Sequence, residues 1–247
     1  SNAGATDAAV TFAAVSGSGN LKNVTVKDSD EFDLVALTLA QVSSAGGNLT
    51  VTAVGKLTDS GALVIPGTTT ITATGQVVTL DHTSNDFETI TFGSSTNAVS
   101  SVVVVDTDDI AIGASESAGD FTVTAGDNVT DSDIVTVGGD LSVTTNAGNG
   151  TIDMRTLAVA AGDNTITLTT HNTGDNNSHA TVVNAYAVKF AASSVDGNLS
   201  ATATTGDITQ TGALTVIGTS TLVTSADDAD ITLTETSNAF TGALLIT

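Results

Sequence analysis

An internal repeat of 72 to 78 residues constrains this chain more than any other feature of its sequence. Residues 47–67, GNLTVTAVGKLTDSGALVIPG, align without a gap with residues 119–139, GDFTVTAGDNVTDSDIVTVGG, and nine positions are identical. Residues 24–34 align in the same way with residues 102–112 at an offset of 78, and a third copy begins at Gly197. A period of this size is typical of folds in which similar units stack on one another.

The repeat also predicts how the chain is organised. Residues 1–3, Ser-Asn-Ala, have the sequence of a scar left by tag cleavage and are set aside. Residues 4–247 then form one continuous domain with a partial unit at 4–46, whole units at 47–118 and 119–196, and a partial unit at 197–247. Because both ends fall inside a unit, we expect the chain to be an excerpt from a longer array.

Short stretches of alternating side chains within each unit predict β-strands. Leu49, Val51 and Ala53 fall on one face of such a strand, and Thr50 and Thr52 fall on the other. Val, Ile and Thr favour a pleated sheet, and the stretches recur about every 20 residues, so each unit holds three or four coils. We predict an all-β fold, a single-stranded parallel β-helix (β-solenoid) with about 12 coils, roughly 55 Å long.

A second all-β fold also suits this pattern. Tandem immunoglobulin-like or cadherin-like β-sandwiches with calcium between them would make an adhesin of a different kind. Units near 75 residues are small for that class, and the chain has no Trp to fill a sandwich core. The solenoid is therefore favoured, although the residues themselves do not fix its handedness.

The charge of the chain excludes several partners. Its net charge is −22, which excludes nucleic acid and anionic membrane surfaces, since both are bound through Lys and Arg. No apolar run reaches the roughly 18–20 residues of a membrane span, so we expect no membrane insertion of this segment. The chain has no Cys, so its stability must come from the core rather than from disulfides. Repulsion between negatively charged copies of the chain favours a monomeric rod.

No enzyme is expected, and no catalytic, cofactor-binding or metal-binding residue is assigned. A polysaccharide-active β-helix enzyme, a minor alternative, would need an Arg or Lys base beside calcium-binding carboxylates. None of the five basic residues lies in a segment rich in Arg, His and aromatic residues. These are Lys22, Lys27, Lys56, Arg155 and Lys189. Carbohydrate clefts also usually need aromatic platforms, and aromatic residues make up only 3% of the chain.

Metal sites are the next possibility. His171 and His179 flank a polar loop and have the chemistry of transition-metal ligands, but incidental loop histidines are the favoured interpretation, as for a solvated turn residue at His82. Acidic clusters at residues 28–31 and 106–109 occupy equivalent places in the repeat. They have oxygen ligands for calcium, yet the favoured interpretation is a solvated turn whose Asp side chains bond their own backbone.

Thr-x-Thr pairs form the last candidate surface. They occur at Thr50/Thr52, Thr70/Thr72, Thr89/Thr91, Thr122/Thr124 and Thr165/Thr167. A flat array of such pairs on a β-solenoid can bind ice, but Thr is also common on the wet face of a strand. The spacing of the pairs along the sequence is too variable for a regular lattice, which makes an ice-binding solenoid a minor alternative.

Two longer motifs carry a resemblance to a known family. GALTVIGTSTL and ITLTETSNAFTGA, within residues 212–243, resemble repeats of filamentous-haemagglutinin-like and autotransporter-type bacterial exoproteins, as do residues 47–87. The resemblance implies a right-handed parallel β-helix that is secreted or displayed on the surface of a Gram-negative cell. It implies a structural or adhesive stalk, with a host-cell, matrix or biofilm component as the partner. These motifs are structural and point to no single receptor.

Overall fold

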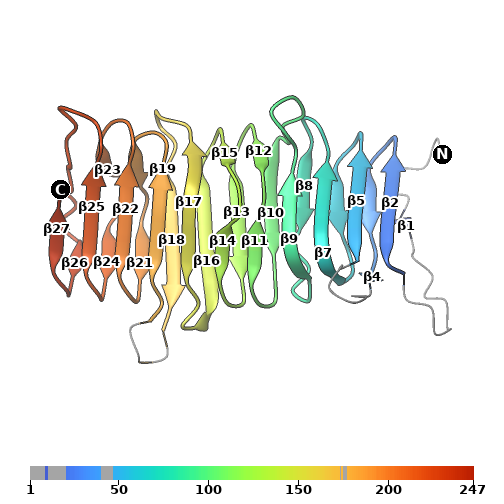
Figure 1. Cartoon of the computed structure of the whole chain (residues 1–247), viewed down its shortest axis with the longest axis horizontal. Coiled ribbons are helices and arrows are strands. Elements are labelled where there is room, and N and C mark those ends of the chain that lie inside the picture. The colour runs from blue at the N-terminus through green and yellow to red at the C-terminus, as the bar shows by residue number, and fades with distance from the viewer. Residues whose placement is uncertain (1–8, 11–20, 40–46, 173, 175–176) are drawn as a thin grey trace.

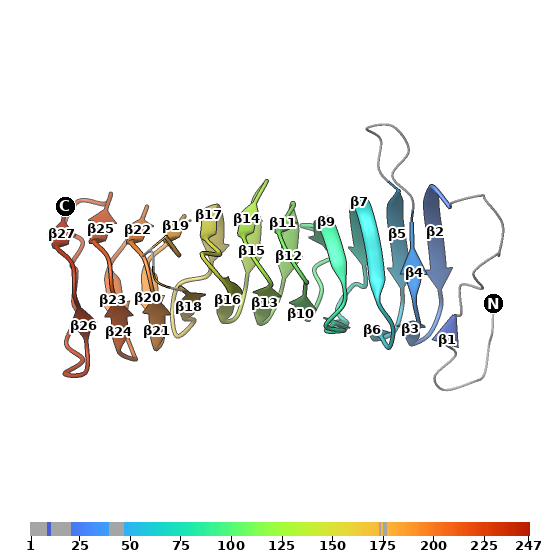
Figure 2. The ribbon, with the colours of Figure 1, turned by 90° about the horizontal axis from the view of Figure 1, so that it is seen from below.

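The computed structural model describes residues 9–10, 21–39, 47–172, 174 and 177–247. In these ranges the chain contains β-strands and no helix, and therefore no helix long and apolar enough to cross a membrane. Every strand pairing described is parallel, and the coils stack into a straight rod with the two chain ends at opposite ends (Figures 1 and 2). The all-β parallel solenoid is thus confirmed, and the tandem β-sandwich alternative is wrong, because sandwiches are built from antiparallel sheets.

Two long sheets form the walls of the rod. Sheet A has 13 strands. Its main path runs through β1 (Ala9–Val10), β3 (Phe32–Leu34), β6 (Leu57–Asp59), β8 (Val77–Leu80), β10 (Ser101–Val105), β13 (Phe121–Ala125), β16 (Leu141–Gly148), β18 (Ile166–His171), β21 (Ser193–Val195), β24 (Leu214–Val216) and β26 (Ala239–Phe240); β20 (Val188–Phe190) and β23 (Ile208–Gln210) branch from it.

Sheet B has 14 strands. Its main path runs through β2 (Asn23–Asp28), β5 (Asn48–Ala53), β7 (Leu63–Thr72), β9 (Asp86–Phe92), β11 (Ile110–Ile112), β14 (Val129–Asp131), β17 (Ile152–Val159), β19 (Ala180–Asn184), β22 (Leu199–Ala203), β25 (Ser220–Thr224) and β27 (Leu244–Ile246); β4 (Leu37–Thr38), β12 (Ser115–Ser117) and β15 (Val135–Val137) branch from it. Since the two paths alternate along the chain, each coil contributes to both walls.

The chain makes about 10 turns, fewer than the roughly 12 expected. Paired residues on successive coils lie between 19 positions apart, as for Ile110 and Val129, and 28 apart, as for Ile152 and Ala180. The turns absorb these extra residues. A coil therefore often contains more residues than the roughly 20 that the strand spacing in the sequence predicted. At about 4.8 Å per coil, the rod is about 50 Å long.

The core fills the space between the sheets with the side chains that the alternation predicted. Val51 and Val123 have no exposed surface, whereas Thr50 and Thr122 lie half-buried on the outside, which confirms the predicted faces of both strands. Phe121 packs edge-to-face against Phe92 with ring centroids 5.5 Å apart. One apolar cluster continues from the first coils to the last without interruption.

Successive repeat units are rotated by half a turn, a relation that the sequence did not predict. In the first unit the longer strands β2, β5, β7 and β9 lie in sheet B, and in the next unit β10, β13, β16 and β18 lie in sheet A. The third unit returns to sheet B with β19, β22 and β25. The aligned residues Leu49 and Phe121 therefore enter the core from opposite walls.

The half turn arises because each unit contributes an odd number of strands to the two main paths. Seven such strands run from β2 to β9 and seven from β10 to β18, so the next unit begins on the other wall. A unit therefore spans three and a half coils, between the three and four expected. Two units make seven coils, so Leu49 and Leu199 lie in the same sheet, at the 150-residue offset seen in the sequence.

Candidate functional site

The outward side chains of the longer strands form regular columns, which we call the hydroxyl faces. In the first unit, on sheet B, Thr25 pairs with Thr50, Thr50 with Thr70, and Thr70 with Thr91. A second column beside it pairs Thr52 with Thr72. The first hydroxyl face consists of Thr25, Thr50, Thr52, Thr70, Thr72 and Thr91.

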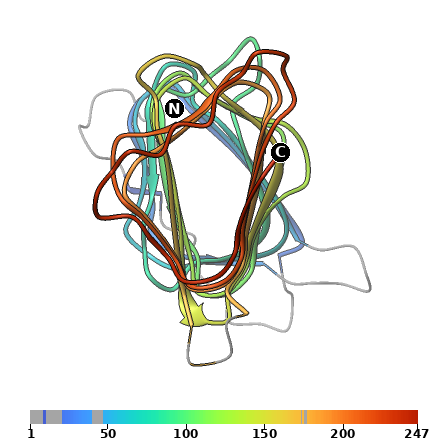
Figure 3. The ribbon, with the colours of Figure 1, turned by 90° about the vertical axis from the view of Figure 1, so that its left-hand side faces the viewer.

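The other two units repeat this arrangement. The second hydroxyl face lies on sheet A, in the columns Val103, Thr122, Ser142 and Thr167, and Val105, Thr124, Thr144 and Thr169. The third lies on sheet B, in the columns Thr181, Ser200 and Thr221, and Val183, Thr202 and Val223. Because the units are related by half turns, neighbouring hydroxyl faces lie on opposite sides of the rod. Figure 3, which looks along the rod, shows the coils stacked around one common centre, with their outline turning gradually from the blue coils to the red ones.

The argument from irregular spacing along the sequence was therefore wrong. Thr25, Thr50, Thr70 and Thr91 are 25, 20 and 21 positions apart, yet they are direct partners in the sheet. The turns absorb the differences in coil length and the strands keep their register. Hydroxyl groups thus repeat about every 4.8 Å along the rod and about every 6.6 Å along a strand.

The chemistry of the hydroxyl faces is uniform. Their Thr, Ser and Val side chains are uncharged, although the chain carries a net charge of −22, and charged residues adjoin them where Lys27 pairs with Thr52 and Asp153 pairs with Thr181. Among their hydroxyl groups, all of which the structure describes, only Thr91 Oγ1 has a protein partner, the carbonyl oxygen of Thr69 at 3.3 Å. The other hydroxyls are free to bond water or a ligand, and the γ-methyl groups between them make the surface half apolar.

Most acidic residues lie at the turns instead, although Glu88, Glu116 and Asp153 lie within strands of sheet B. In the first acidic cluster, Asp28 Oδ1 accepts the Asp30 N–H at 2.9 Å, and Asp30 Oδ1 accepts the Glu31 N–H at 3.0 Å. These bonds to neighbouring backbone confirm the predicted turn chemistry. In the described residues no group of three His, Asp or Glu side chains has the arrangement of a metal site.

The second acidic cluster differs because Asp106 is buried rather than solvated. Its Oδ2 accepts the Phe87 N–H at 2.7 Å and its Oδ1 accepts the Asp108 N–H at 3.0 Å. Desolvation, with a smaller contribution from the Asp108 charge, raises the pKa of Asp106 to about 7. The carboxylate thus joins two coils at the cost of burying its charge.

A buried polar pair explains the TSN motif of the repeat. Asn85 donates to Asp59 Oδ2 at 2.6 Å and accepts the Leu63 N–H at 2.9 Å. In the third unit, Asn238 forms the same kind of pair with Gln210 and accepts the Leu214 N–H at 2.9 Å. Burial raises the pKa of Asp59 as well. The motif is therefore structural, since it satisfies backbone groups between coils.

Sequence reasoning missed side-chain ladders at the strand starts. Asn23 Oδ1 accepts the Asn48 N–H at 3.0 Å, and Asn48 Oδ1 accepts the Thr68 N–H at 2.9 Å. Three ladders follow the same rule: Asp109, Asn128 and Thr151; Asp120, Asp140 and Thr165; and His179, Asn198 and Thr219. Part of the signal was visible, as the GN or GD dipeptide at the start of β5, β13, β16 and β22.

The histidines hold turns and do not come together. His82 is half-buried, and its Nδ1 lies 3.2 Å from the Ser84 N–H. His171 Nδ1 lies 2.8 Å from the carbonyl oxygen of Thr145, and His179 Nδ1 accepts the Asn198 N–H at 2.9 Å. The Nδ1 atom of each of the three rings is thus engaged with the backbone.

The basic residues are also scattered. Arg155 Nε contacts Asp153 Oδ1 at 2.5 Å on the surface, and this contact raises the pKa of Arg155. Lys189 Nζ donates to the carbonyl oxygen of Gly162 and lies 3.6 Å from Asp163. Both are used in local surface contacts, with no adjoining set of acid, base and nucleophile among the described residues.

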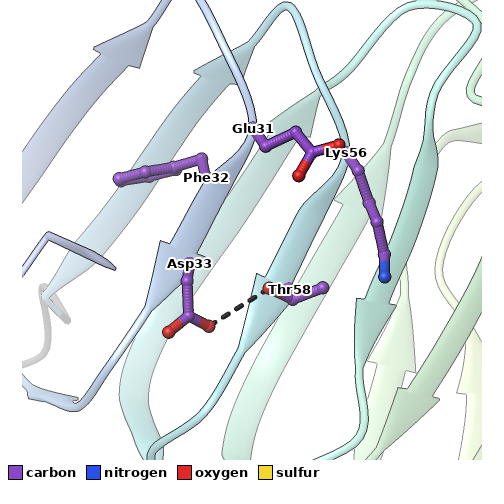
Figure 4. A pocket seen from close by; sticks show the side chains of 5 residues that line it. All are labelled: Glu31, Phe32, Asp33, Lys56 and Thr58. Atoms are coloured by element: carbon purple, nitrogen blue, oxygen red, sulfur yellow. Dashed lines mark hydrogen bonds between the residues drawn. The ribbon is translucent and has the colours of Figure 1, made fainter. Parts of the chain in front are cut away.

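The hollows described on the surface are open rather than enclosed, and one of about 440 Å³ lies over the carboxylates Glu88, Asp109 and Asp153. Figure 4 shows one of about 60 Å³ between Glu31 and Lys56, in which Thr58 Oγ1 donates to Asp33 Oδ1 at 3.1 Å. This volume is well below the roughly 300 Å³ of a small-molecule pocket. A wider hollow of about 300 Å³ lies over Thr181 and Ser200, so it belongs to the third hydroxyl face. Extended contact along a wall fits this surface better than an enclosed ligand does.

A comparison with known families accounts for the repeat. The profile of one family, described as Repeats of unknown function (DUF5649), matches residues 21–92, 97–158 and 176–247. The chain belongs to this family. Each DUF5649 match begins shortly before the first longer strand of a unit, β2, β10 or β19, so the family repeat starts where the structural unit starts; the second match ends before β18. No curated protein and no solved structure matches the chain.

Proposed function

We propose that the chain is a structural and adhesive stalk segment of a large bacterial protein that is secreted or held at the cell surface. The observation that carries this proposal is the single apolar core that runs through all the coils. Each coil contacts only its neighbours, so length is gained simply by adding repeats. Such a rod suits a spacer that holds a binding surface away from a cell.

The surface supports a role in contact rather than catalysis. Its hollows are open, its basic residues are scattered, and its most regular features are the columns of Thr, Ser and Val on the walls. The resemblance to filamentous-haemagglutinin-like and autotransporter-type repeats adds a bacterial surface location and a host-cell, matrix or biofilm component as partner. A chain without cysteine also suits export in an unfolded state.

Antibodies raised against the purified chain test the location. On intact, unpermeabilised cells of the source bacterium, or in its culture medium, they should detect the protein, while a cytosolic marker stays undetected. Labelling that appears only after the cells are permeabilised would overturn the proposal.

A further inference from the structure

We propose that the hydroxyl faces bind the surface of ice crystals. The proposal rests on the register of the sheets: Thr50, Thr70 and Thr91 are direct partners on sheet B, and Thr122, Ser142 and Thr167 are direct partners on sheet A. A crystal is itself a periodic array. A protein surface matches it only if its own groups repeat at fixed intervals in two directions, and the parallel strands supply both intervals.

The walls are flat enough for such contact. Sheets normally twist by about 20° from strand to strand, which would carry outer columns out of one plane. Here the strands of each wall run side by side along the rod, and the view down its axis shows the outline of the coils turning only gradually from the blue coils to the red ones (Figures 1 and 3). Rows of hydroxyl groups therefore stay in one plane over several coils.

The hydroxyl groups are available for this contact. Apart from Thr91 Oγ1, no hydroxyl of the three faces, all described in the structure, donates to or accepts from another protein group. Each is therefore bonded to water in solution, and water molecules held on a regular array of donors and acceptors are already positioned to join an ice surface. The γ-methyl group of each Thr fills the space between them.

The distribution of charge favours an uncharged partner. Most acidic side chains, such as Asp28, Asp106 and Asp109, lie at the turns, and the hydroxyl faces hold Thr, Ser and Val. Charged side chains stand only beside the faces, where Lys27 pairs with Thr52 and Asp153 pairs with Thr181. An ionised side chain orients its own shell of water, which opposes the arrangement that ice requires. A crystalline polysaccharide is also neutral, but flat polysaccharide sites usually use aromatic platforms, and these faces hold none.

Because of the half turn between units, both walls of the rod carry faces that bind ice. The first and third hydroxyl faces lie on sheet B and the second lies on sheet A. Substitutions on one wall should therefore weaken ice binding, and substitutions on both walls should remove most of it. This dependence follows from the fold and does not rest on the proposed stalk role.

The test measures how much purified protein a slowly growing ice hemisphere takes up from solution. We expect enrichment in ice and slowed ice recrystallisation for the natural protein. Thr50→Lys with Thr70→Lys alters sheet B, and Thr124→Lys with Thr144→Lys alters sheet A. Together, the four substitutions should lower the ice-to-liquid ratio at least about tenfold, which corresponds to about 1.4 kcal/mol of binding free energy.

The matched control for each two-substitution variant places the same two charges at exposed turns, with Thr83→Lys and Thr107→Lys. It should keep the activity of the natural protein, and urea unfolding should show that every variant is folded. Exclusion of the natural protein from ice, or an equal loss in the turn control, would overturn the proposal. Retention on crystalline cellulose or chitin without uptake into ice would assign the faces to a polysaccharide instead.

Discussion

Val123 offers the sharpest test of how the coils are held together. Its side chain has no exposed surface and lies in sheet A between Val104 and Val143. Val123→Asp places a carboxylate among these apolar neighbours. Thr122→Asp, one position earlier, places the same group on the outer face beside Val103 and Ser142. The two variants differ only in which side of the strand receives the charge.

The expected costs follow from burial. Loss of the Val side chain from the core removes about 2 kcal/mol of stabilisation. The buried carboxyl must also be protonated, and at pH 7 this costs about 4 kcal/mol for a group with an ordinary pKa near 3.9. Val123→Asp should therefore lower the free energy of unfolding by about 6 kcal/mol, a large part of the roughly 5–15 kcal/mol of a typical domain. Thr122→Asp should cost about 1 kcal/mol or less.

Urea unfolding and hydrogen exchange measure these effects. Because each coil contacts only its neighbours, Val123→Asp should increase exchange in β10, β13 and β16, while β5 keeps its protection. At pH 4.5 the protonation cost falls below about 1 kcal/mol, so part of the stability should return. Equal damage from the two variants would refute the assigned faces. Uniform loss of protection from one end to the other would refute the view that coils depend only on their neighbours.

Three further predictions concern ions, pH and catalysis. Millimolar calcium should raise the melting temperature no more than sodium at equal ionic strength, since both screen the net charge of −22; a clearly larger calcium effect would reveal specific sites. The pKa of Asp106 is about 7 in the folded state against 3.8 for an ordinary Asp, so the folded state binds this proton more tightly than the unfolded state does. Proton binding at Asp106 therefore stabilises the fold below about pH 4, and this stabilisation is lost as the pH rises through 7. Urea midpoints should therefore fall from pH 4.5 to 7.5, and Asp106→Asn should reduce that fall, whereas an unchanged fall would contradict the assignment. Incubation with pectin, alginate or another polyuronate should release no product, and turnover abolished by Arg155→Ala or Lys189→Ala would establish an enzyme.

Much of the fold could be predicted from the alternation of side chains. The inward positions of Val51 and Val123 followed directly, because one face of a strand in a solenoid must be apolar. The GN and GD dipeptides and the TSN motif were visible as patterns, but their role as ladders and buried pairs depends on contacts between residues about 20 to 28 positions apart. Those contacts can be predicted only once the number of residues in each coil is known.

The half turn between units could not be predicted for a different reason. Both walls of a solenoid bury the same alternating pattern, so the matching of Leu49 with Phe121 in sequence does not say that they share a wall. The hydroxyl faces could not be predicted either. Irregular spacing along the sequence suggested a disordered set of Thr pairs, whereas the turns absorb the irregularity and the strands remain in register.

Cysteine cross-linking tests the half-turn relation most directly, since the natural chain has no Cys to interfere. Thr79 and Val103 are direct partners on the outer face of sheet A, about 4.8 Å apart at Cα, which suits a disulfide. Under mild oxidation, Thr79→Cys with Val103→Cys should cross-link rapidly. Thr91→Cys with Val103→Cys should not, because β9 lies in sheet B. Rapid cross-linking of the second pair and not of the first would show that β10 stacks on β9, and would contradict the three-and-a-half-coil unit.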